Sequence, residues 1–287
     1  MPEKSVAIIV ITYRNPGYLA GLLENMRWAG WPDVPTYVFQ DPSPFDDRVE
    51  VNAAYLDVIN RFPEVTQFYT AVEWSCMQGI TEHAFRMTDE DWLIWVPDDV
   101  RFTQGSLWNE YGGVLTYGRE WVGGIQAPYW NAHDLVAMGV MKSKEQMLHG
   151  WQPASIPRNP FWETGGMPRA YVNLNGAGFS LSRKLWRAMG GFPRITWRLD
   201  EYAGYQGWKH GMPIITLPGT PRVHYFGGAT DKLPEGYGFH TEEAWIAALG
   251  KPVAEATGEI YSVMHRLKYG GLWNEMVKFF NEGGKLV

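Results

Sequence analysis

The sequence predicts an α/β fold built on a mostly parallel sheet, and two observations support this prediction. Short apolar runs rich in β-branched residues alternate along the chain with segments whose apolar residues recur at helical spacing. In addition, the run at residues 92–96 is apolar throughout and is soon followed by two adjacent carboxylates, Asp98 and Asp99. A strand buried on both faces of a parallel sheet has this pattern, and ligands bind beyond the carboxyl ends of such strands.

The first half of the chain supplies the strands and helices of this sheet in order. Residues 6–12 are β-branched and apolar, and the turn cluster after them opens a helix at residues 18–28 with an apolar inner face. Strands and helices continue to alternate, with strands at residues 36–40, 65–70 and 92–96 and helices at residues 47–61 and 79–87. Such strand–helix–strand units produce parallel neighbours.

The second half is less regular. Residues 128–170 are rich in proline, glycine and tryptophan, and a span of this kind inside a domain is typically a binding loop or a lid. Around it we expect strands at residues 121–127, 171–181 and 213–217, and helices at residues 182–189 and 200–211. Amphipathic helices follow from about residue 241. We therefore expect one domain at residues 1–230, with residues 128–170 as an insertion, and a helical extension at residues 231–287.

Composition and charge argue against several classes of protein. The 287 residues carry a formal net charge of −6 without a lysine- and arginine-rich block, which argues against binding along a nucleic-acid backbone. The single Cys76 excludes an internal disulfide and a multi-cysteine zinc site. No signal-peptide pattern and no apolar run near the ~18 residues of a membrane span occur, so we expect a cytoplasmic protein. The 15 tryptophans favour a carbohydrate ligand, although most tryptophans fill cores.

Polar or acidic residues follow three of the predicted strands. They are Thr12, Asp41 and the pair Asp98 and Asp99. Because parallel strands bring their carboxyl ends to one edge of a sheet, we expect these side chains to meet there. Carboxylates at such an edge suit Mg²⁺ or Mn²⁺ beside a ribose or a phosphate; alternatively, they only cap the turns in which they lie. The sequence has no glycine-rich phosphate-binding loop, so a metal on Asp99 would have to neutralise a bound diphosphate.

Over roughly residues 5–230 the order of motifs resembles the inverting glycosyltransferases of family 2, which have the GT-A fold. This fold is Rossmann-like, with a mostly parallel central sheet flanked by helices. Residues 10–19, Val-Ile-Thr-Tyr-Arg-Asn-Pro-Gly-Tyr-Leu, are similar to the first strand end of that family and its following helix. The resemblance implies that Thr12 and Tyr13 belong to the donor-binding site.

The same resemblance implies roles for three acids. Asp41 stands where the family places an acid that contacts the base of the donor. Pro97-Asp98-Asp99 stands at the D-x-D motif, which implies that Asp98 lies near the ribose and that Asp99 binds the metal. The sequence departs from the family at Pro97, which replaces the first acid of the motif. It departs again between residues 74 and 85, where the usual Arg-Asn pair is missing.

The second half carries the more specific motifs. Residues 176–183 and 189–192 are similar to the family's segment before its catalytic acid, and Gly211 follows Asp200 at the family's spacing. The resemblance implies that Asp200 is the general base, with Glu201 as the rival, and that His224 completes the metal site. Alternatively, Asp200 and Glu201 are only acids that favour a helix N-terminus. Without the resemblance, an ordinary core or surface histidine is the preferred explanation for His224.

The implied function is metal-dependent, inverting transfer of a sugar from a nucleotide-sugar donor to an acceptor hydroxyl. A UDP-sugar is the preferred donor, and the cofactor is Mn²⁺ or Mg²⁺. A glycan or another hydroxyl-bearing molecule is the expected acceptor, whereas modified DNA is not favoured. Trp130, Trp151 and Trp162 are candidate acceptor contacts, although packing is the preferred explanation for them. The alternatives are a nucleotidyltransferase with this type of sheet and a catalytically silent carbohydrate-binding protein.

Overall fold

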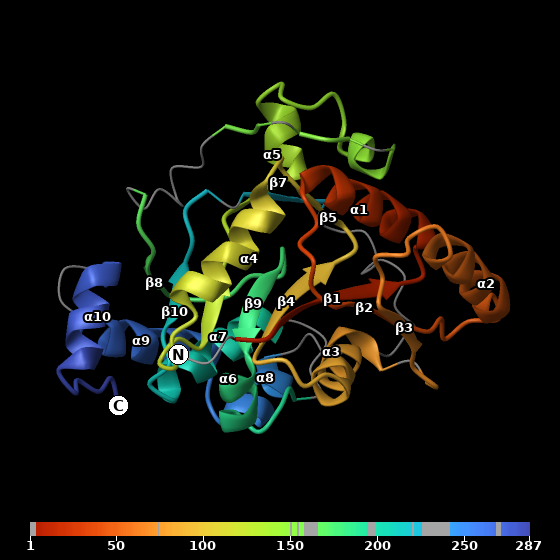
Figure 1. Cartoon of the computed structure of the whole chain (residues 1–287). Coiled ribbons are helices and arrows are strands. Elements are labelled where there is room, and N and C mark those ends of the chain that lie inside the picture. The colour runs from red at the N-terminus through yellow and green to blue at the C-terminus, as the bar shows by residue number, and fades with distance from the viewer. Residues whose placement is uncertain are drawn as a thin grey trace.

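An eight-stranded sheet, in the order β3-β2-β1-β4-β9-β6-β10-β8, forms the centre of the computed structural model (Figure 1). The structure describes residues 4–73, 75–149, 151–153, 155–157, 166–193, 199–219, 221–225, 242–267 and 271–287. The strands of the sheet are β1 (Val6–Tyr13), β2 (Thr36–Asp41), β3 (Gln67–Thr70), β4 (Trp92–Pro97), β6 (Gly124–Gln126), β8 (Arg169–Tyr171), β9 (Phe179–Ser182) and β10 (Ile214–Thr216).

The half of the sheet formed by β1 to β4 is parallel. β1 lies between β2 and β4, with Val10 opposite Val38 on one side and opposite Val96 on the other. β6 and β10 are also parallel to each other, while β8 and β9 are antiparallel to their neighbours. The side chains of β1 are buried along nearly its whole length, as the uninterrupted apolar run predicts. The predicted mostly parallel sheet is thus confirmed.

Helices flank the sheet on both faces, and Figure 1 shows α1 and α4 above it and α3 and α6 below it. Apolar residues at helical spacing give α1 its buried face, which includes Leu19, Leu22 and Met26. The helices before the C-terminal region are α1 (Pro16–Ala29), α2 (Arg48–Ile59), α3 (Cys76–Met87), α4 (Ser106–Tyr117), α5 (Ala132–Ala137), α6 (Arg183–Ala188) and α7 (Leu199–Lys209), with a 3₁₀ helix η1 (Lys144–His149).

A second, three-stranded sheet lies at the carboxyl end of β4. Its order is β5 (Val100–Phe102), β11 (Arg222–His224) and β7 (Tyr129–Asn131). β5 follows β4 after only two residues, Asp98 and Asp99, so the acid pair links the two sheets. The sequence did not predict this sheet, because strands of three residues are too short to display a periodicity.

Two expectations about the second half need correction. The strand expected at residues 171–181 is two strands, β8 and β9, which lie apart in the sheet and are joined by a loop. The loop forms because asparagines and glycines favour turns, and Gly178 has a φ of +105°, which other residues rarely adopt. The insertion at residues 128–170 is less irregular than expected, since it contains β7, α5 and η1.

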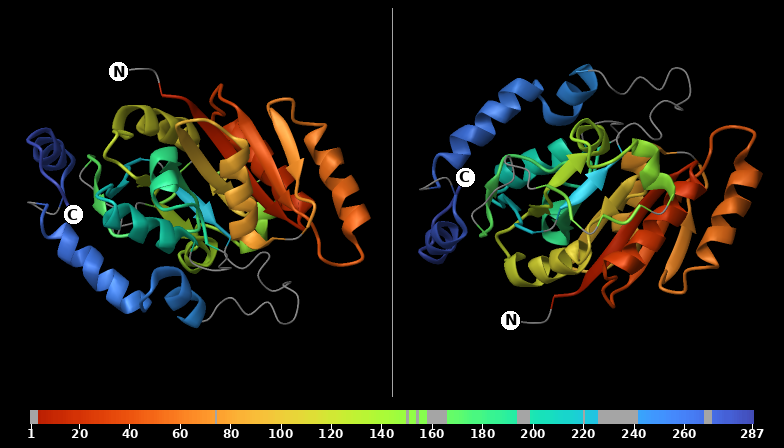
Figure 2. Two further views of the ribbon diagram at one scale, coloured as in Figure 1. Left: turned by 90° about the horizontal axis from the view of Figure 1, so that it is seen from below. Right: turned by 90° about the horizontal axis from the view of Figure 1, so that it is seen from above.

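Three helices form the C-terminal region: α8 (Glu242–Leu249), α9 (Val253–Met264) and α10 (Trp273–Asn281). Figure 2 shows α10 and much of α9 at the end of the molecule remote from α2, and Figure 1 shows α8 near α6. The expected boundary near residue 230 lies outside the described residues. Among the helices of the described ranges, none combines the length and the apolar character needed to cross a membrane.

Trp95, at the centre of β4, gives a test of this core. Its ring stacks on Phe179 with centroids 4.9 Å apart, and its Nε1 donates to Thr81 Oγ1 at 3.1 Å. We expect Trp95→Ala to lower the free energy of unfolding by ~3–5 kcal/mol, because it leaves a large cavity. Trp108, which is 52% exposed, is the matched control, and Trp108→Ala should change stability by less than about 1 kcal/mol. Urea unfolding measures both; equal losses would contradict the assignment of Trp95 to the core.

Candidate functional site

Thr12 and Asp98 meet at the carboxyl ends of β1 and β4. Thr12 Oγ1 donates to Asp98 Oδ2 at 2.5 Å and lies 2.7 Å from the hydroxyl of Tyr55. That hydroxyl accepts from the backbone N–H of Asn15 at 2.8 Å, so its own proton is available for Thr12. Burial, and next the neighbouring Asp99 carboxylate, raise the pKa of Asp98 to about 8. A chain of hydrogen bonds through Thr12 and Tyr55 thus fixes Asp98. The sequence predicted Thr12 at this place but not Tyr55.

His224 faces Asp99 because of strand pairing in the small sheet. β11 is antiparallel to β5, with His224 opposite Val100, and the N–H of Tyr225 donates to the carbonyl of Asp99 at 2.9 Å. His224 Nε2 lies 3.3 Å from Asp99 Oδ2, and both side chains are largely buried. Burial lowers the pKa of His224, but the Asp99 and Asp200 carboxylates raise it by more, so the net shift is upward.

The Asp99 and His224 pair has the chemistry and the spacing for a divalent cation. Two ligands at neighbouring corners of an octahedron with bonds of ~2.1 Å lie about 3.0 Å apart, close to the 3.3 Å between Oδ2 and Nε2. Among the described side chains no three His, Cys, Asp or Glu residues gather to hold a metal. Mg²⁺ commonly keeps waters and binds substrate phosphates, so one or two protein ligands suffice for such an ion.

A buried arginine holds the turn that carries the acids. Arg101 is fully buried; its Nη1 donates to the carbonyls of Asp98 at 3.0 Å and Val100 at 2.7 Å, and its Nε donates to the carbonyl of Met147 at 2.8 Å. The side chain therefore ties η1 to the acid turn. Burial lowers the pKa of Arg101 to about 10, while the Asp98 and Asp99 carboxylates oppose this shift.

Two tyrosines lie beside the acid pair, and a lysine lies over the ring of one of them. The rings of Tyr18 and Tyr225 are 5.5 Å apart, and Lys144 Nζ lies 4.7 Å from the ring of Tyr225. Burial and a hydrogen bond with Tyr225 raise the pKa of Tyr18, and the Asp99 and Asp98 carboxylates add to the shift. The sequence did not predict these residues. Tyr225 alone carries a signal, because it directly follows His224.

Asp200 lies in the first turn of α7 and is partly buried. It is within electrostatic reach of the Asp99 and His224 pair. Its carboxylate influences the pKa of both His224 and Tyr129. Burial, followed by the nearby Glu201 carboxylate, raises the pKa of Asp200 to about 6, although backbone N–H groups, including that of Gly176, stabilise the charged form. The structure therefore brings Asp200 to the same region as Asp99 and His224.

The loop between β8 and β9 contacts both Asp200, through the N–H of Gly176, and β7, through the side chain of Asn175. Asn175 donates from Nδ2 to the hydroxyl of Tyr129 at 2.9 Å and accepts at Oδ1 from the N–H of Ala177 at 3.0 Å. The N–H of Asn175 donates to Gln126 Oε1 at 2.5 Å. The Tyr129 ring lies 6.5 Å from the ring of His224. These polar residues were also missed, because their convergence depends on strands distant in sequence.

Asp41, the predicted contact of the donor's base, lies at the end of β2, and Tyr13, a predicted donor-binding residue, lies at the end of β1. Tyr13 is opposite Asp41 in the parallel register, and Asp41 is only 2% exposed. Asp41 Oδ1 accepts from the backbone N–H of Ser75 at 2.9 Å. The Asp41 carboxylate is thus engaged within the protein. Burial raises the pKa of Tyr13 to about 12, although the adjacent Arg14 opposes the shift.

Two of the three candidate acceptor tryptophans pack against a small apolar cluster around Val223 and Tyr225. Trp130 lies in β7, and its Nε1 donates to the carbonyl of Pro157 at 2.9 Å, while Trp151 follows η1. Trp162 lies outside the described residues. Packing thus accounts for the observed contacts of Trp130 and Trp151.

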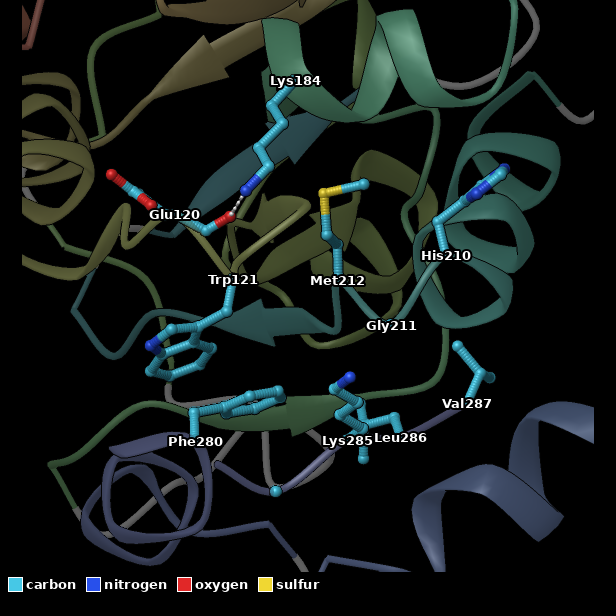
Figure 3. Close-up of a pocket in the computed structure, with 11 residues that line it drawn as sticks. Glu120, Trp121, Lys184, His210, Gly211, Met212, Phe280, Lys285, Leu286 and Val287 are labelled. Carbon is cyan, nitrogen blue, oxygen red and sulfur yellow. Dashed lines mark hydrogen bonds between the residues drawn. The ribbon is translucent and has the colours of Figure 1, made fainter. Parts of the chain in front are cut away.

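A cavity of about 410 Å³ lies away from this site, at the amino-terminal ends of β6 and β10 (Figure 3). Trp121 and Phe280 form one wall, stacked with centroids 4.4 Å apart, and Lys184 and His210 are among the other lining residues. None of the predicted site residues lines it.

Comparison with known proteins gives matches to solved structures only. No family model matches the sequence, and no curated protein matches it. The mannosyltransferase PcManGT from Pyrobaculum calidifontis, in complex with GDP-Man and Mn²⁺, superposes with a TM-score of 0.57 at 15% identity, over 99% of this chain and 70% of that chain.

TarS residues 1–349 from S. aureus match in the complexes with UDP-GlcNAc and with UDP, with TM-scores of 0.53 and 0.52 at 12% identity. The match covers 77% of this chain and 58% and 60% of those chains, so this chain spans somewhat more than half of their length. These neighbours are complexes with GDP-Man, UDP-GlcNAc or UDP, and one of them is a mannosyltransferase; at this identity the likeness concerns the fold. The chain therefore has the GT-A-like fold that the sequence resemblance implied.

Proposed function

We propose that the protein transfers a sugar from a nucleotide-sugar donor to an acceptor hydroxyl, with inversion at the anomeric carbon and with a divalent cation. One observation carries the proposal: Asp200 lies within electrostatic reach of the Asp99–His224 pair, which lies beyond the carboxyl end of β4 in the large sheet. This sheet belongs to a fold shared with glycosyltransferases that bind GDP-Man or UDP-GlcNAc. A fold alone does not define an activity, so the residues at the edge carry the argument.

The donor is proposed to lie along the carboxyl ends of β1, β2 and β4, with a UDP-sugar preferred. Thr12 and Asp98 are oriented there by the hydrogen bond between them, and Asp98 is assigned to the ribose. Asp99 and His224 would hold Mn²⁺ or Mg²⁺, which supplies Lewis-acid stabilisation of the departing diphosphate. Lys144, beside Tyr225, is a cation of this chain that lies within the same region.

Asp200 is proposed to act as the general base. In the reaction the bond between the anomeric carbon and the diphosphate oxygen breaks, and a bond from that carbon to the acceptor oxygen forms. The proton of the acceptor hydroxyl passes to an Asp200 carboxylate oxygen, and the products are the nucleoside diphosphate and a glycoside of inverted configuration. The acceptor would approach from the side of residues 128–170. The interactions that support Asp200 over Glu201 are its link to Gly176 and its effects on His224 and Tyr129.

The two alternatives fit these observations less well. A nucleotidyltransferase of this type would use a glycine-rich basic loop after β1, and residues 12–17 do not provide one. A sugar-binding protein without catalytic activity has no need of a partly buried carboxylate such as Asp200, with a pKa of about 6, near the Asp99 and His224 pair. Both observations favour an active transferase.

The metal assignment predicts the behaviour of two variants. Asp99→Ala and His224→Ala should each weaken Mn²⁺ binding at least ~10-fold, since even the loss of partners outside the ligand sphere has effects of this size. Isothermal titration calorimetry with Mn²⁺ measures the affinity. A screen of nucleotide sugars for Mn²⁺-dependent donor hydrolysis then measures the loss of activity.

His133 provides the matched control for that experiment. His133 Nε2 lies 3.1 Å from Asp134 Oδ1, but both side chains are exposed. This pair therefore has the same residue types as Asp99 and His224 without their burial. His133→Ala should leave Mn²⁺ binding unchanged. If Asp99→Ala bound Mn²⁺ and hydrolysed the donor as the parent protein does, the metal assignment would be wrong.

The base assignment predicts different effects at adjacent acids. Asp200→Asn should lower kcat for sugar transfer by a factor of ~10²–10⁴, because the amide cannot accept the proton. Glu201→Gln should lower it far less. Steady-state kinetics with saturating donor measures both, and the reverse order of effects would move the base to Glu201.

The raised pKa of Asp200 predicts a pH dependence of activity. The base must be deprotonated, so kcat should be constant at higher pH and should fall as pH drops through about 6. The fall should be tenfold per pH unit. A pH–rate profile whose acidic limb lies near pH 4 instead would show that Asp200 titrates as an ordinary carboxyl group in the working enzyme.

A further inference from the structure

A second buried arginine lies behind the site. Arg222, in β11, is fully buried and pairs with Glu110 of α4, which is buried as well. Arg222 Nη2 lies 2.5 Å from Glu110 Oε1, and Nε lies 3.1 Å from Oε2. Ser180 Oγ donates to the same carboxylate at 3.0 Å, and the guanidinium carbon lies 4.9 Å from the ring centre of Phe102.

The remaining donor of this guanidinium contacts two backbone segments of the site. Arg222 Nη1 donates to the carbonyl of Trp95 at 3.3 Å and to that of Ala177 at 3.2 Å. Trp95 precedes Asp98 by three residues in the chain, and Ala177 follows Gly176, whose N–H interacts with Asp200. Arg222 itself precedes His224 by two residues. One side chain therefore joins the two segments that carry the proposed metal ligands to the loop that contacts the proposed base, Asp200.

Gly178 marks how closely the loop passes over this side chain. A Cβ atom added at Gly178 would lie 1.5 Å from Arg222 Nη1 and 2.9 Å from the carbonyl oxygen of Trp95. Gly178 also has a φ of +105°. The loop can therefore reach the guanidinium only with glycine at this position.

Net stability alone does not account for such an arrangement. A buried ion pair can often be replaced by apolar residues of similar volume with no loss of stability. Apolar residues, however, have no donors with which to hold two carbonyls at fixed positions, whereas the planar guanidinium has five. The carboxylate of Glu110 fixes the plane of that guanidinium through a two-pronged contact.

We propose that Arg222, oriented by Glu110, is a positioning residue that sets the Asp99–His224 pair relative to Asp200. The inference rests on the function proposed above. Inverting transfer requires the base and the departing diphosphate on opposite sides of the anomeric carbon, and a displacement of about 1 Å can lower the rate ~10²-fold. Arg222 touches no substrate in this scheme and acts through the backbone.

The test uses a double variant and a matched control. Glu110→Met with Arg222→Met removes the donors without leaving an unpaired buried charge, and Arg222→Lys keeps a charge for Glu110 but loses the planar fork. Arg183→Met is the control: Arg183 is also buried and donates to the carbonyls of Phe85 and Glu90, at the opposite end of β4 from the site.

The first measurement is amide hydrogen exchange at Gly178 and Tyr225, whose N–H groups donate to the carbonyls of Asn175 and Asp99. We expect exchange there to be about tenfold faster in the Glu110 and Arg222 double variant and in Arg222→Lys, but unchanged in Arg183→Met. Unchanged exchange at both amides in a folded Arg222 variant would overturn the proposal, whatever the activity of the protein.

The second measurement is steady-state transfer. The double variant and Arg222→Lys should lose ~10²-fold in kcat with little change in the KM for the donor, while Arg183→Met should affect only the melting temperature. An equal loss of kcat in Arg183→Met would reduce Arg222 to a structural role and overturn the proposal. If exchange responds as expected but the parent protein turns over no nucleotide sugar, the proposed function fails and the positioning role of Arg222 remains.

Discussion

The parallel pairing of β1 with β4 is the interaction on which the site depends. The ladder extends one residue beyond β4, because the N–H of Asp98 donates to the carbonyl of Ile11 at 3.1 Å. This bond places Asp98 beside Thr12 and makes Asp99 the first residue that leaves the large sheet. The small sheet can then present His224 to Asp99 because β5 starts immediately afterwards.

Around this point the protein buries several charged groups, and backbone atoms contact most of them. Arg101 and Arg222 donate to carbonyls on both sides of the acid turn, and the Gly176 N–H interacts with Asp200. Burying charge is unfavourable unless each group is paired or hydrogen-bonded. The buried charges therefore cost folding stability but hold the side chains in fixed positions. This is expected of a site whose charged groups are oriented before its ligand binds.

The sequence predicts the parts of this structure that depend on local pattern. β1, β2 and β4 are six residues or longer and buried, so their apolar runs are visible, and Asp98 and Asp99 follow directly from where β4 ends. Asp200 and His224 were predicted through a resemblance in motif order, and their roles stay predictions. The single strand expected at residues 171–181 was wrong, because apolar residues on both sides of a turn resemble one continuous run.

Other site residues could not be found in the sequence, because tertiary contacts define them. Tyr55 reaches Thr12 from the middle of α2, and Asn175 reaches Tyr129 of β7 from the loop between β8 and β9. A buried arginine such as Arg222 is indistinguishable in sequence from a surface arginine. Its role becomes visible only when Glu110, which is 112 positions away in the chain, lies next to it.

The short connection between the two sheets restricts how this part of the chain can vary in length. Only Asp98 and Asp99 separate β4 from β5, and successive residues of a strand point to opposite faces. Inserting one residue there would turn Arg101 away from its carbonyl acceptors and shift Val100 from its place opposite His224. Related chains that keep this architecture should therefore conserve the spacing between the two sheets even where the residues flanking the acids differ.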